Sequence, residues 1–288
     1  MFKHKRDYKL YYNLFLESSF PCEEWEIGIV GVPLDITTSN KSGTRFAPDE
    51  IRSASWSIET YIPYLNKDIS SRKYVDLGNI ELSNGNLELN LQIISSFAED
   101  YADKKMVYIG GEHLITLPIF ARYAQKYVDI CLIQLDAHAD LRYEYLGAIY
   151  SHATVMYHCL ELISPDRFFQ LGIRSGTMEE FELCRKYETI YDFSHKNLEK
   201  LKRKIGERPV YLSIDVDVFD PSLCPATGTP ECGGIFYTDY LNFLNCLRDL
   251  NVVAFDVVEL SPHYDITKSS STLCAKIIRD TMANFWYE

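Results

Sequence analysis

Short apolar runs bounded by polar turns recur along the chain. They are rich in Val, Ile and Leu, a composition typical of strands that are buried on both faces of a sheet. The clearest of them occupy residues 26–33, 105–111, 130–138, 167–174, 210–219 and 252–260. Because longer, helix-like stretches separate these runs, the chain is predicted to consist of βαβ units. We therefore expect an α/β fold of three layers (α/β/α), with helices on both sides of a central, mostly parallel sheet.

Two of the intervening stretches carry a clear helical pattern. Residues 194–204 are polar and rich in Lys. Residues 238–250 begin at Thr238 or Asp239, either of which would serve as a helix cap, and their apolar side chains recur at helical spacing, at Tyr240, Phe243, Leu244 and Leu247. No internal repeat, low-complexity tract or linker rich in Pro, Gly or Ser divides the 288 residues. We therefore expect a single domain over residues 1–288.

Composition and charge narrow the function classes. With 47% hydrophobic residues, the chain has enough apolar surface for a large core. Its net charge of -12 counts against a nucleic-acid-binding protein, because phosphate backbones are bound by a surplus of Lys and Arg. No run of about 18 apolar residues predicts a membrane span, and the first residues do not read as a signal peptide. We expect a soluble, cytoplasmic protein that binds neither nucleic acid nor membrane.

The eight cysteines are scattered, and none forms a CxxC pair. A zinc finger or a disulfide framework therefore has little support. We expect reduced thiols, most of them packed in the core.

Carboxylates and histidines follow several of the predicted strands. The sequence GGEH occupies residues 110–113, DAHAD residues 136–140 and DVD residues 215–217, and Glu259 ends the last apolar run. In an open α/β sheet, ligand sites form in the crevice beyond the carboxyl ends of the strands. These four groups are therefore predicted to meet at one edge of the sheet.

The spacing of these residues predicts a metal centre. Within DAHAD and DVD the polar side chains alternate with other residues, and in extended chain alternate side chains point the same way. They form an oxygen-rich set without thiolates, suited to hard or borderline divalent metals: His113, Asp136, His138, Asp140, Asp215 and Asp217. This set is too large for one tetrahedral site, but it fits two metals about 3.5 to 4 Å apart that share a hydroxide. The set therefore predicts a hydrolytic centre.

Each of these residues has a simpler interpretation when it is taken alone. A buried Asp after a strand is often a helix cap or a member of an ion pair, and a His beside an apolar run is usually a hydrogen-bonded core residue. The set as a whole favours the metal centre, because clustering so many carboxylates without a cation would be electrostatically costly.

The chain resembles the ureohydrolase family, which contains arginases and agmatinases, in strings that occur in the family's order. They are GGEH at 110–113, DAHADLR at 136–142, SHA at 151–153, SIDVDVFDPSLCPATGTPECGG at 213–234 and DVVELSPHYD at 256–265. The stretches GVPLD at 31–35 and GTRFAP at 43–48 also resemble these enzymes. One departure is Glu112, where many members carry Asp, and we expect it to affect metal binding little because His113 is kept. The resemblance covers almost the whole chain and implies an arginase-like fold.

The resemblance also implies two manganese ions per chain. One would be held by His113, Asp136, Asp140 and Asp215, and the other by Asp136, His138, Asp215 and Asp217, so that Asp136 and Asp215 bridge. Metal binding makes water acidic enough to be hydroxide near neutral pH, and the hydroxide between the ions would attack a guanidinium carbon. Cobalt, nickel or iron could occupy such a site instead.

Further residues receive roles beside the metals. Asp140 would pass a proton to the departing amine, with His152 as a wider relay. Glu259 would orient the guanidinium through two parallel hydrogen bonds, and Thr229 would line the pocket floor. The last three keep an alternative each: His152 could only pack against its loop, Glu259 could belong to an ion pair, and Thr229 could only shape its turn.

The segment after Asp140 guides the choice of substrate. Residues 141–151 read LRYEYLGAIYS, which is similar to agmatinases, and GIRSGTMEEFE at 172–182 strengthens the similarity. We therefore expect agmatine, a small guanidinium cation, to be hydrolysed to putrescine and urea, a step of polyamine biosynthesis. Glu231 would attract the distal amine of agmatine, although its position would equally suit an exposed turn residue.

Other interpretations stay open at this point. The same metal centre could serve guanidinobutyrate, an aminopropylated agmatine, formiminoglutamate or arginine, each with different contacts to the substrate tail. A metal-binding protein without turnover is a further alternative, which the complete ligand set disfavours. Deacylation on the same type of fold lacks support in the ATGTP and DVVELSP strings. The resemblance also implies assembly as a homotrimer or a homohexamer.

Overall fold

The computed structural model describes residues 13–18, 24–71 and 73–287. Within these residues, eight parallel strands form one sheet in the order β4, β1, β5, β10, β9, β6, β7, β8. The strands are β1 (Ile27–Val32), β4 (Tyr74–Asn79), β5 (Lys105–Gly110), β6 (Cys131–Leu135), β7 (Phe168–Leu171), β8 (Ile190–Tyr191), β9 (Pro209–Asp215) and β10 (Asn251–Val258). A separate antiparallel hairpin pairs β2 (Tyr61–Ile62) with β3 (Lys67–Asp68). The prediction of a central parallel sheet is confirmed.

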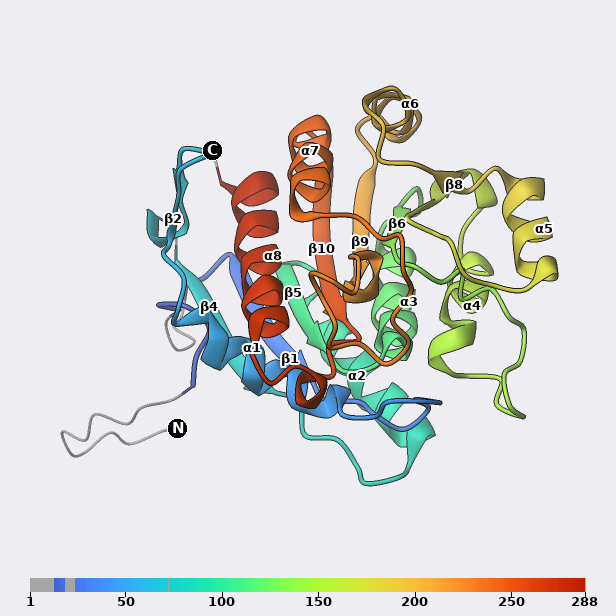
Figure 1. The fold of residues 1–288 in the computed structure, drawn as a ribbon, viewed down its shortest axis with the longest axis horizontal. Coiled ribbons are helices and arrows are strands. Elements are labelled where there is room, and N and C mark those ends of the chain that lie inside the picture. The colour runs from blue at the N-terminus through green and yellow to red at the C-terminus, as the bar shows by residue number, and fades with distance from the viewer. Residues whose placement is uncertain (1–12, 19–23, 72, 288) are drawn as a thin grey trace.

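Helices cover both faces of the sheet (Figure 1). One face packs against α1 (Ala47–Ser55), α6 (His195–Ile205), α7 (Tyr237–Leu247) and α8 (Ser269–Trp286). The other face packs against α2 (Leu87–Tyr101), α3 (Thr116–Lys126) and α4 (Val155–Leu160), while α5 (Met178–Tyr187) lies at the β8 end of the sheet. The predicted three-layer α/β/α arrangement is therefore confirmed.

Strand β1 illustrates why the predicted runs are apolar throughout. Ile27 and Ile29 belong to the core on one face of the sheet, and Val30 and Val32 belong to the core on the other face. None of these four side chains is more than 1% exposed. Because helices cover both faces, neither set of alternate positions can be polar, and the strand reads as a continuous apolar run.

The predicted strands and helices coincide with observed elements apart from their ends. Helix α6 begins after Ser194, whose hydroxyl accepts a hydrogen bond from the amide N of Asn197 at 3.4 Å. The predicted cap of α7 is wrong, since Phe236 is its N-cap residue. The Asp239 carboxylate instead accepts from the amide N of Phe236 at 2.9 Å, and so closes the first turn from inside the helix. Strands β4 and β8 and the β2–β3 hairpin are additions that the apolar runs did not reveal.

The expectation of reduced, packed cysteines holds for the described part of the chain. The cysteines there are free thiols, and most of them are buried: Cys131, Cys159, Cys184, Cys224 and Cys274. Cys22 lies outside the described residues, as do residues 1–12, where a signal peptide was considered. Among the helices that the structure describes, none combines the length and the apolar character needed to cross a membrane.

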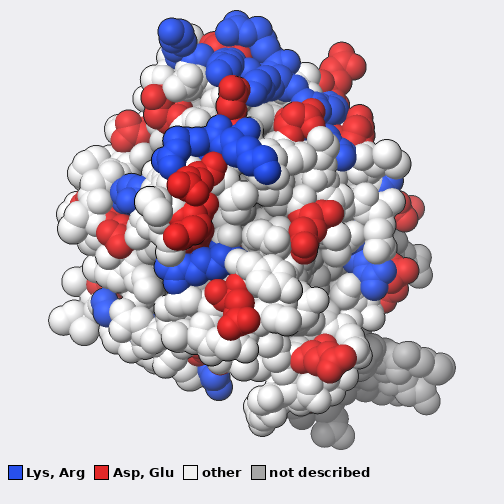
Figure 2. Space-filling model, turned by 90° about the vertical axis from the view of Figure 1, so that its right-hand side faces the viewer, with Lys and Arg blue, Asp and Glu red and all other residues white. Residues whose placement is uncertain are grey.

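The negative net charge is not spread evenly over the surface. At the end of the molecule that carries α5 and α6, Lys and Arg side chains gather at the top, where α6 lies (Figure 2). The last turn of α6 contains Lys202, Arg203 and Lys204, and cations there offset the partial negative charge of the helix end. The Lys202 ammonium also pairs with Asp249, at 2.6 Å. This basic cluster therefore has a structural explanation.

Candidate metal centre and pocket

The predicted groups meet at the carboxyl edge of four adjacent strands. In the sheet, β5, β10, β9 and β6 are neighbours, and all four run in the same direction. His113 follows β5, Glu259 follows β10, Asp215 ends β9 and Asp136 follows β6. Parallel strands end at the same edge, so residues far apart in the sequence are brought into one site.

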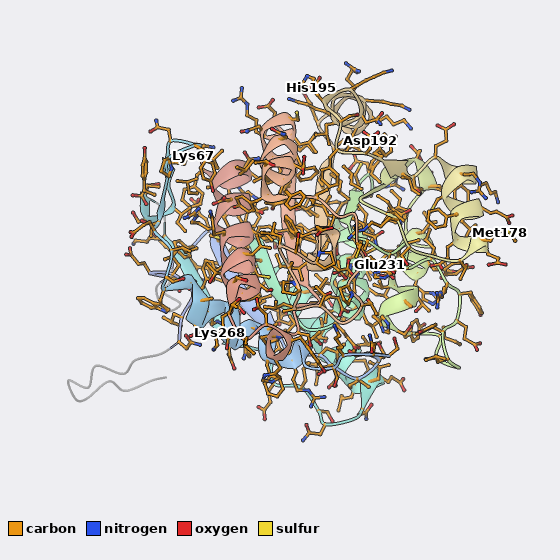
Figure 3. The ribbon with its side chains drawn as sticks, in the orientation of Figure 1. Lys67, Met178, Asp192, His195, Glu231 and Lys268 are labelled. Carbon is orange, nitrogen blue, oxygen red and sulfur yellow. The ribbon has the colours of Figure 1, made fainter. Side chains whose placement is uncertain are left out.

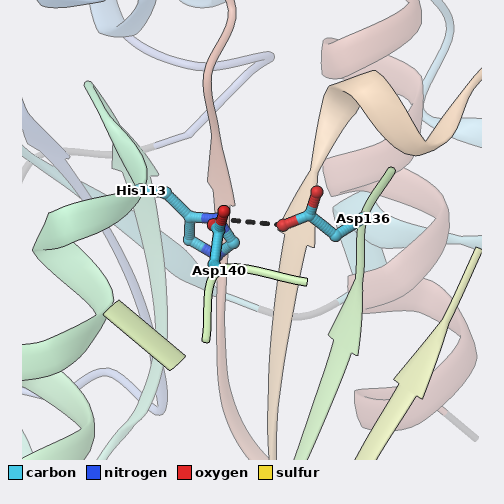
Figure 4. A group of neighbouring side chains, drawn as sticks. All are labelled: His113, Asp136 and Asp140. Carbon is cyan, nitrogen blue, oxygen red and sulfur yellow. Dashed lines mark ion pairs between the residues drawn. The ribbon is translucent and has the colours of Figure 1, made fainter. Parts of the chain in front are cut away.

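The imidazole of His113 faces three carboxylates, and Figure 4 shows two of them, Asp136 and Asp140. Its Nδ1 atom lies 3.1 Å from Asp136 Oδ2, 3.1 Å from Asp140 Oδ2 and 3.4 Å from Asp215 Oδ2. All four side chains are buried, and Nδ1 has no hydrogen-bond partner. A buried nitrogen without a partner, set among carboxylate oxygens, is the arrangement expected where a cation binds.

A second group of ligand atoms lies beside the first. His138 Nδ1 is 2.8 Å from Asp217 Oδ2 and 3.7 Å from Asp136 Oδ1. Within the described residues, His113, Asp136 and Asp140 form one candidate metal group, and Asp136, His138 and Asp217 form another, each with ligand atoms within 4.8 Å of one another. Asp136 is common to both groups and Asp215 belongs to neither, so the bridging by these two aspartates stays a prediction.

Backbone amides hold one oxygen of each of three aspartates. The amide N of His138 donates to Asp136 Oδ1 at 2.6 Å, that of Asp217 donates to Asp215 Oδ1 at 2.9 Å, and that of Ala137 donates to Asp217 Oδ1 at 3.0 Å. In each case Oδ2 faces a histidine Nδ1 atom. The backbone therefore orients the carboxylates before any cation binds.

Without a cation, the negative charges of this cluster would repel one another. Burial and then the charge of Asp217 raise the pKa of Asp215 well above its usual value. Burial and then the charge of Asp136 raise the pKa of Asp140 to about 7. Bound cations would remove this penalty, so the donor set fits divalent metals on electrostatic grounds as well as by atom type.

The predicted extended geometry of the ligands needs a correction. Strand β6 ends at Leu135, and Asp140 has a left-handed backbone with φ of 53°. Asp217 lies in a short 3-10 helix, Val216–Val218, rather than in extended chain. The side chains converge because these turns redirect the backbone, which spacing alone could not indicate. A left-handed backbone conformation costs energy for an aspartate, and such strain is common at functional sites.

Two residues behind His113 were missed by the sequence interpretation. His113 Nε2 lies 2.9 Å from Ser213 Oγ, and the Ser213 hydroxyl donates to Asp256 Oδ1 at 2.7 Å. Both residues stand in the strings that carry the family resemblance, but their side chains come from strand interiors, where a packing role is the usual interpretation. Partners of this kind fix the orientation of a ligating imidazole.

A pocket of about 210 Å³ opens beside the ligands. Its lining brings together ligands and predicted substrate residues: His138, Asp140, Arg142, His152, Thr229 and Glu231. Glu231, labelled in Figure 3, belongs to the loop between β9 and α7. Its carboxylate accepts a hydrogen bond from the Ser175 hydroxyl at 3.0 Å. Two of the predicted ligands and three of the predicted substrate residues therefore share one cavity, whereas Glu259 is not among its lining residues.

His152 is held at the pocket by the loop that follows β1. Its Nδ1 is 3.3 Å from Thr37 Oγ1, its Nε2 is 3.4 Å from Ser39 Oγ, and its amide N donates to Thr37 Oγ1 at 3.0 Å. Burial, with the nearby His113 as a second cause, lowers the pKa of His152 to about 4. The ring is therefore neutral at neutral pH.

Known proteins resemble the chain over most of its length. The arginase family model matches residues 25–283. The chain belongs to the arginase family. It is 39% identical to an agmatinase of Bacillus cereus, over 93% of this chain and 95% of the relative, and 34% identical to a guanidinobutyrase of Pseudomonas aeruginosa, over 93% and 88%. The crystal structure of agmatine ureohydrolase from Thermoplasma volcanium is similar with a TM-score of 0.86 at 32% identity, over 96% of this chain and 95% of that chain.

As a member of the arginase family, the chain is a ureohydrolase with a His and Asp site that can hold metal ions. Glu259 borders this site. Its Oε1 accepts a hydrogen bond from the amide N of His113 at 2.6 Å, and its own backbone is left-handed, with φ of 67°. Burial, with the charge of Glu112 as a lesser cause, raises the pKa of Glu259 to about 8.

Glu180 is a further residue of this ureohydrolase that the sequence interpretation missed. It lines the pocket, pairs with Arg142 Nε at 3.2 Å and accepts from the amide N of Leu141 at 2.9 Å. The signal was present, since Thr177 and Glu180 form the T-x-x-E capping box that begins α5. Glu180 thereby anchors the segment directly after Asp140.

Proposed function

We propose that this ureohydrolase hydrolyses the guanidinium group of agmatine to give putrescine and urea. The main support is the pocket in which Glu231 shares the lining with the ligands His138 and Asp140. A guanidinium at the ligands would leave its tail along the pocket, and a carboxylate there attracts an ammonium group. The chain is 39% and 36% identical to two agmatinases over most of its length, which supports the same choice.

We further propose that the site holds two manganese ions. His113, Asp136, Asp140 and Asp215 would hold one, and Asp136, His138, Asp215 and Asp217 the other, because these oxygen and imidazole donors suit a metal of this hardness. When bound, the metals would supply a water-derived nucleophile at neutral pH and charge stabilisation.

The chain's own residues would then orient the substrate and move its protons. Glu259 would pair with the guanidinium fork, since the hydrogen bond that Oε1 accepts from the amide N of His113 orients its carboxylate, and each carboxylate oxygen can accept more than one hydrogen bond. Asp140 lies at the pocket beside the ligands, and it would carry a proton to the departing amine, which leaves as a neutral group. His152 would accept or relay that proton, and Thr229 would shape the lining.

A second candidate substrate, guanidinobutyrate, has one observation in its favour. Arg142 lines the same pocket, and a tail carboxylate would pair with its guanidinium. However, the Arg142 Nε already faces Glu180 at 3.2 Å, so its charge is largely offset. Because the chain is also similar to a guanidinobutyrase, guanidinobutyrate is included among the substrates to be tested.

A substrate panel tests the proposed function. Manganese-reconstituted protein would be incubated separately with agmatine, guanidinobutyrate, arginine, aminopropylagmatine and formiminoglutamate, and urea and the other products quantified. Urea from agmatine alone, lost in Asp217→Ala but kept in the surface control Asp249→Ala, is the expected result. Turnover of another compound would replace the substrate, and silence on all five with two metals bound would favour the non-catalytic alternative.

We also propose that the chain assembles as a homotrimer or a homohexamer. Apolar side chains are exposed on the loop between β6 and α4, among them Tyr143 (58%), Leu146 (82%) and Tyr150 (47%). Such patches often mark protein contacts. Light scattering would measure the mass, and a monomer at working concentration would contradict the proposal.

A further inference from the structure

We propose that Glu112 is a positioning residue that fixes the tautomer of His152, so that Nδ1 carries the ring proton and Nε2 stays bare as a proton acceptor. Glu112 stands in GGEH beside the ligand His113, but the proposed chemistry leaves it without a role. The inference rests on the proposed function, in which His152 moves protons in the pocket.

The Glu112 side chain is buried and organises the segment after β1. Its Oε2 accepts hydrogen bonds from the amide N atoms of Ile36 at 3.0 Å and Thr37 at 2.7 Å. Its Oε1 accepts from the Thr37 hydroxyl at 3.0 Å, and Thr38 Oγ1 lies 3.3 Å from Oε2. The two backbone amides can only donate and the Thr37 hydroxyl donates to Oε1, so the Glu112 carboxylate is the acceptor in these three bonds, while the Thr38 hydroxyl also donates to Asp35 Oδ1 at 3.0 Å.

The Thr37 hydroxyl transmits this constraint to His152. A hydroxyl has one hydrogen, and that of Thr37 is directed at Glu112. The Thr37 oxygen accepts from the amide N of His152 at 3.0 Å and lies 3.3 Å from Nδ1. The contact with Nδ1 is therefore a hydrogen bond only if Nδ1 is the donor. A neutral imidazole carries one ring hydrogen, so Nε2 is bare, and the Ser39 hydroxyl at 3.4 Å can donate to it.

An amide at position 112 would reverse the direction of the hydrogen bonds between residue 112, Thr37 and His152. In Glu112→Gln, the carbonyl oxygen would keep the backbone contacts, and the NH₂ group would donate to Thr37 Oγ1. The Thr37 hydrogen would then turn to Nδ1 of His152, and the ring proton would move to Nε2. Since a protonated Nε2 cannot accept a proton from the pocket, the proton relay would be weakened. Glu112→Asp keeps an acceptor-only group and should retain the wild-type tautomer.

Nitrogen NMR tests the proposal without relying on activity. The ring ¹⁵N shifts of ¹⁵N-histidine-labelled protein, loaded with diamagnetic magnesium at pH 8, distinguish a protonated from a bare nitrogen. The His152 signals are those that disappear in His152→Asn. We expect Nδ1–H in the wild type and in Glu112→Asp, and Nε2–H in Glu112→Gln.

Two adjacent threonines provide a matched control. Both hydroxyls contact Glu112, but only that of Thr37 reaches His152. Thr37→Val should abolish the preference for Nδ1–H, and Thr38→Val should retain it. This pair leaves the buried charge in place, so it carries the test even if Glu112→Gln fails to fold. Nε2–H in the wild type, or an equal response of the two valine variants, would overturn the proposal.

Kinetics extend the test to the reaction. Glu112→Gln should lower kcat for agmatine about tenfold with less than about a threefold change in KM, and in a His152→Asn background it should lower kcat by no more than about twofold. A merely structural role would give the same factor in both backgrounds. If no compound yields urea, the proposed function fails, while the tautomer result is still decided by NMR.

Discussion

His113 and Ser213 join two strands that are not neighbours in the sheet. Nε2 of His113, which follows β5, lies 2.9 Å from Oγ of Ser213 in β9, and β10 runs between these strands. Asp256 of β10 accepts the Ser213 hydrogen, so the contact spans all three strands. It fixes the His113 ring with Nδ1 toward the carboxylates.

Ser213→Ala should weaken metal binding without dismantling the fold. The substitution leaves His113 Nε2 without its partner, and loss of such partners costs roughly 10- to 100-fold in metal affinity. Competition with a chromophoric chelator would measure the affinity. Ser222→Ala, on an exposed turn, is the control, and an unchanged affinity in Ser213→Ala would contradict the role assigned to Ser213.

Metal removal should lower thermal stability. The buried carboxylates of Asp136, Asp140, Asp215 and Asp217 repel one another without cations. At a metal concentration of about 100 times Kd, binding stabilises the fold by roughly 2.7 kcal/mol, which corresponds to a Tm shift on the order of 5 °C or more. Calorimetry with and without EDTA measures the shift. Asp217→Ala should respond less to EDTA, and an equal Tm in both conditions would argue against a metal centre.

Glu231→Gln should weaken the binding of a substrate with a positively charged tail, but not that of a substrate with a negatively charged tail. Removing this half-buried carboxylate should raise the KM for agmatine about fivefold, an effect on the order of 1 kcal/mol, with kcat little changed. Steady-state kinetics with guanidinobutyrate provides the control, since its tail carboxylate should be bound no worse. A KM that is unchanged for agmatine would remove Glu231 from the substrate site.

Asp265 should make the fold sensitive to acid. Its Oδ2 accepts from the amide N of Ser270 at 2.9 Å and from the Ser269 hydroxyl at 3.0 Å, at the start of α8. Burial acts to raise the pKa of Asp265, but hydrogen bonds, first of all from Thr267, hold it well below the usual value of 3.8. A depressed folded-state pKa stabilises the fold above the unfolded pKa, and this contribution is lost as pH falls from about 4 downward.

Urea denaturation of wild type and Asp265→Asn at pH 7 and pH 3 checks this sign. At pH 7 the variant should be less stable by about 1 kcal/mol, the usual cost of a lost helix-end hydrogen bond. The difference should shrink at pH 3. A gap that is constant with pH would mean that the Asp265 charge does not matter.

The Arg52 and Asp76 pair should be far more important for stability than surface pairs. Arg52 Nε lies 2.7 Å from Asp76 Oδ2, and the two side chains are 2% and 0% exposed. Arg52→Leu leaves a buried carboxylate without its cation and should cost about 3 to 5 kcal/mol of unfolding free energy. Lys202→Ala, which breaks the partly exposed pair with Asp249, should cost less than about 1 kcal/mol. Equal losses in urea denaturation would refute the distinction.

The sequence by itself determined the layered fold and the candidate metal residues. Strands covered on both faces must be apolar at every position, so β1, β5, β6, β9 and β10 are visible as runs. The short strand β8 and the strand β4, which contains Asp76 and Asn79, lie toward the sheet edges and give weaker patterns. The candidate metal residues were recognised because Asp and His side chains directly after buried strands are unusual and gather at one edge.

The tertiary structure decided how these residues meet. The insertion of β10 between β5 and β9 places Glu259 beside His113, and no local pattern encodes that strand order. The left-handed backbone of Asp140 and the contact between Thr37 and His152, 115 positions apart, depend on loops whose geometry is set by packing. Local propensity and periodicity act over a few residues, whereas these contacts depend on how the whole sheet is assembled.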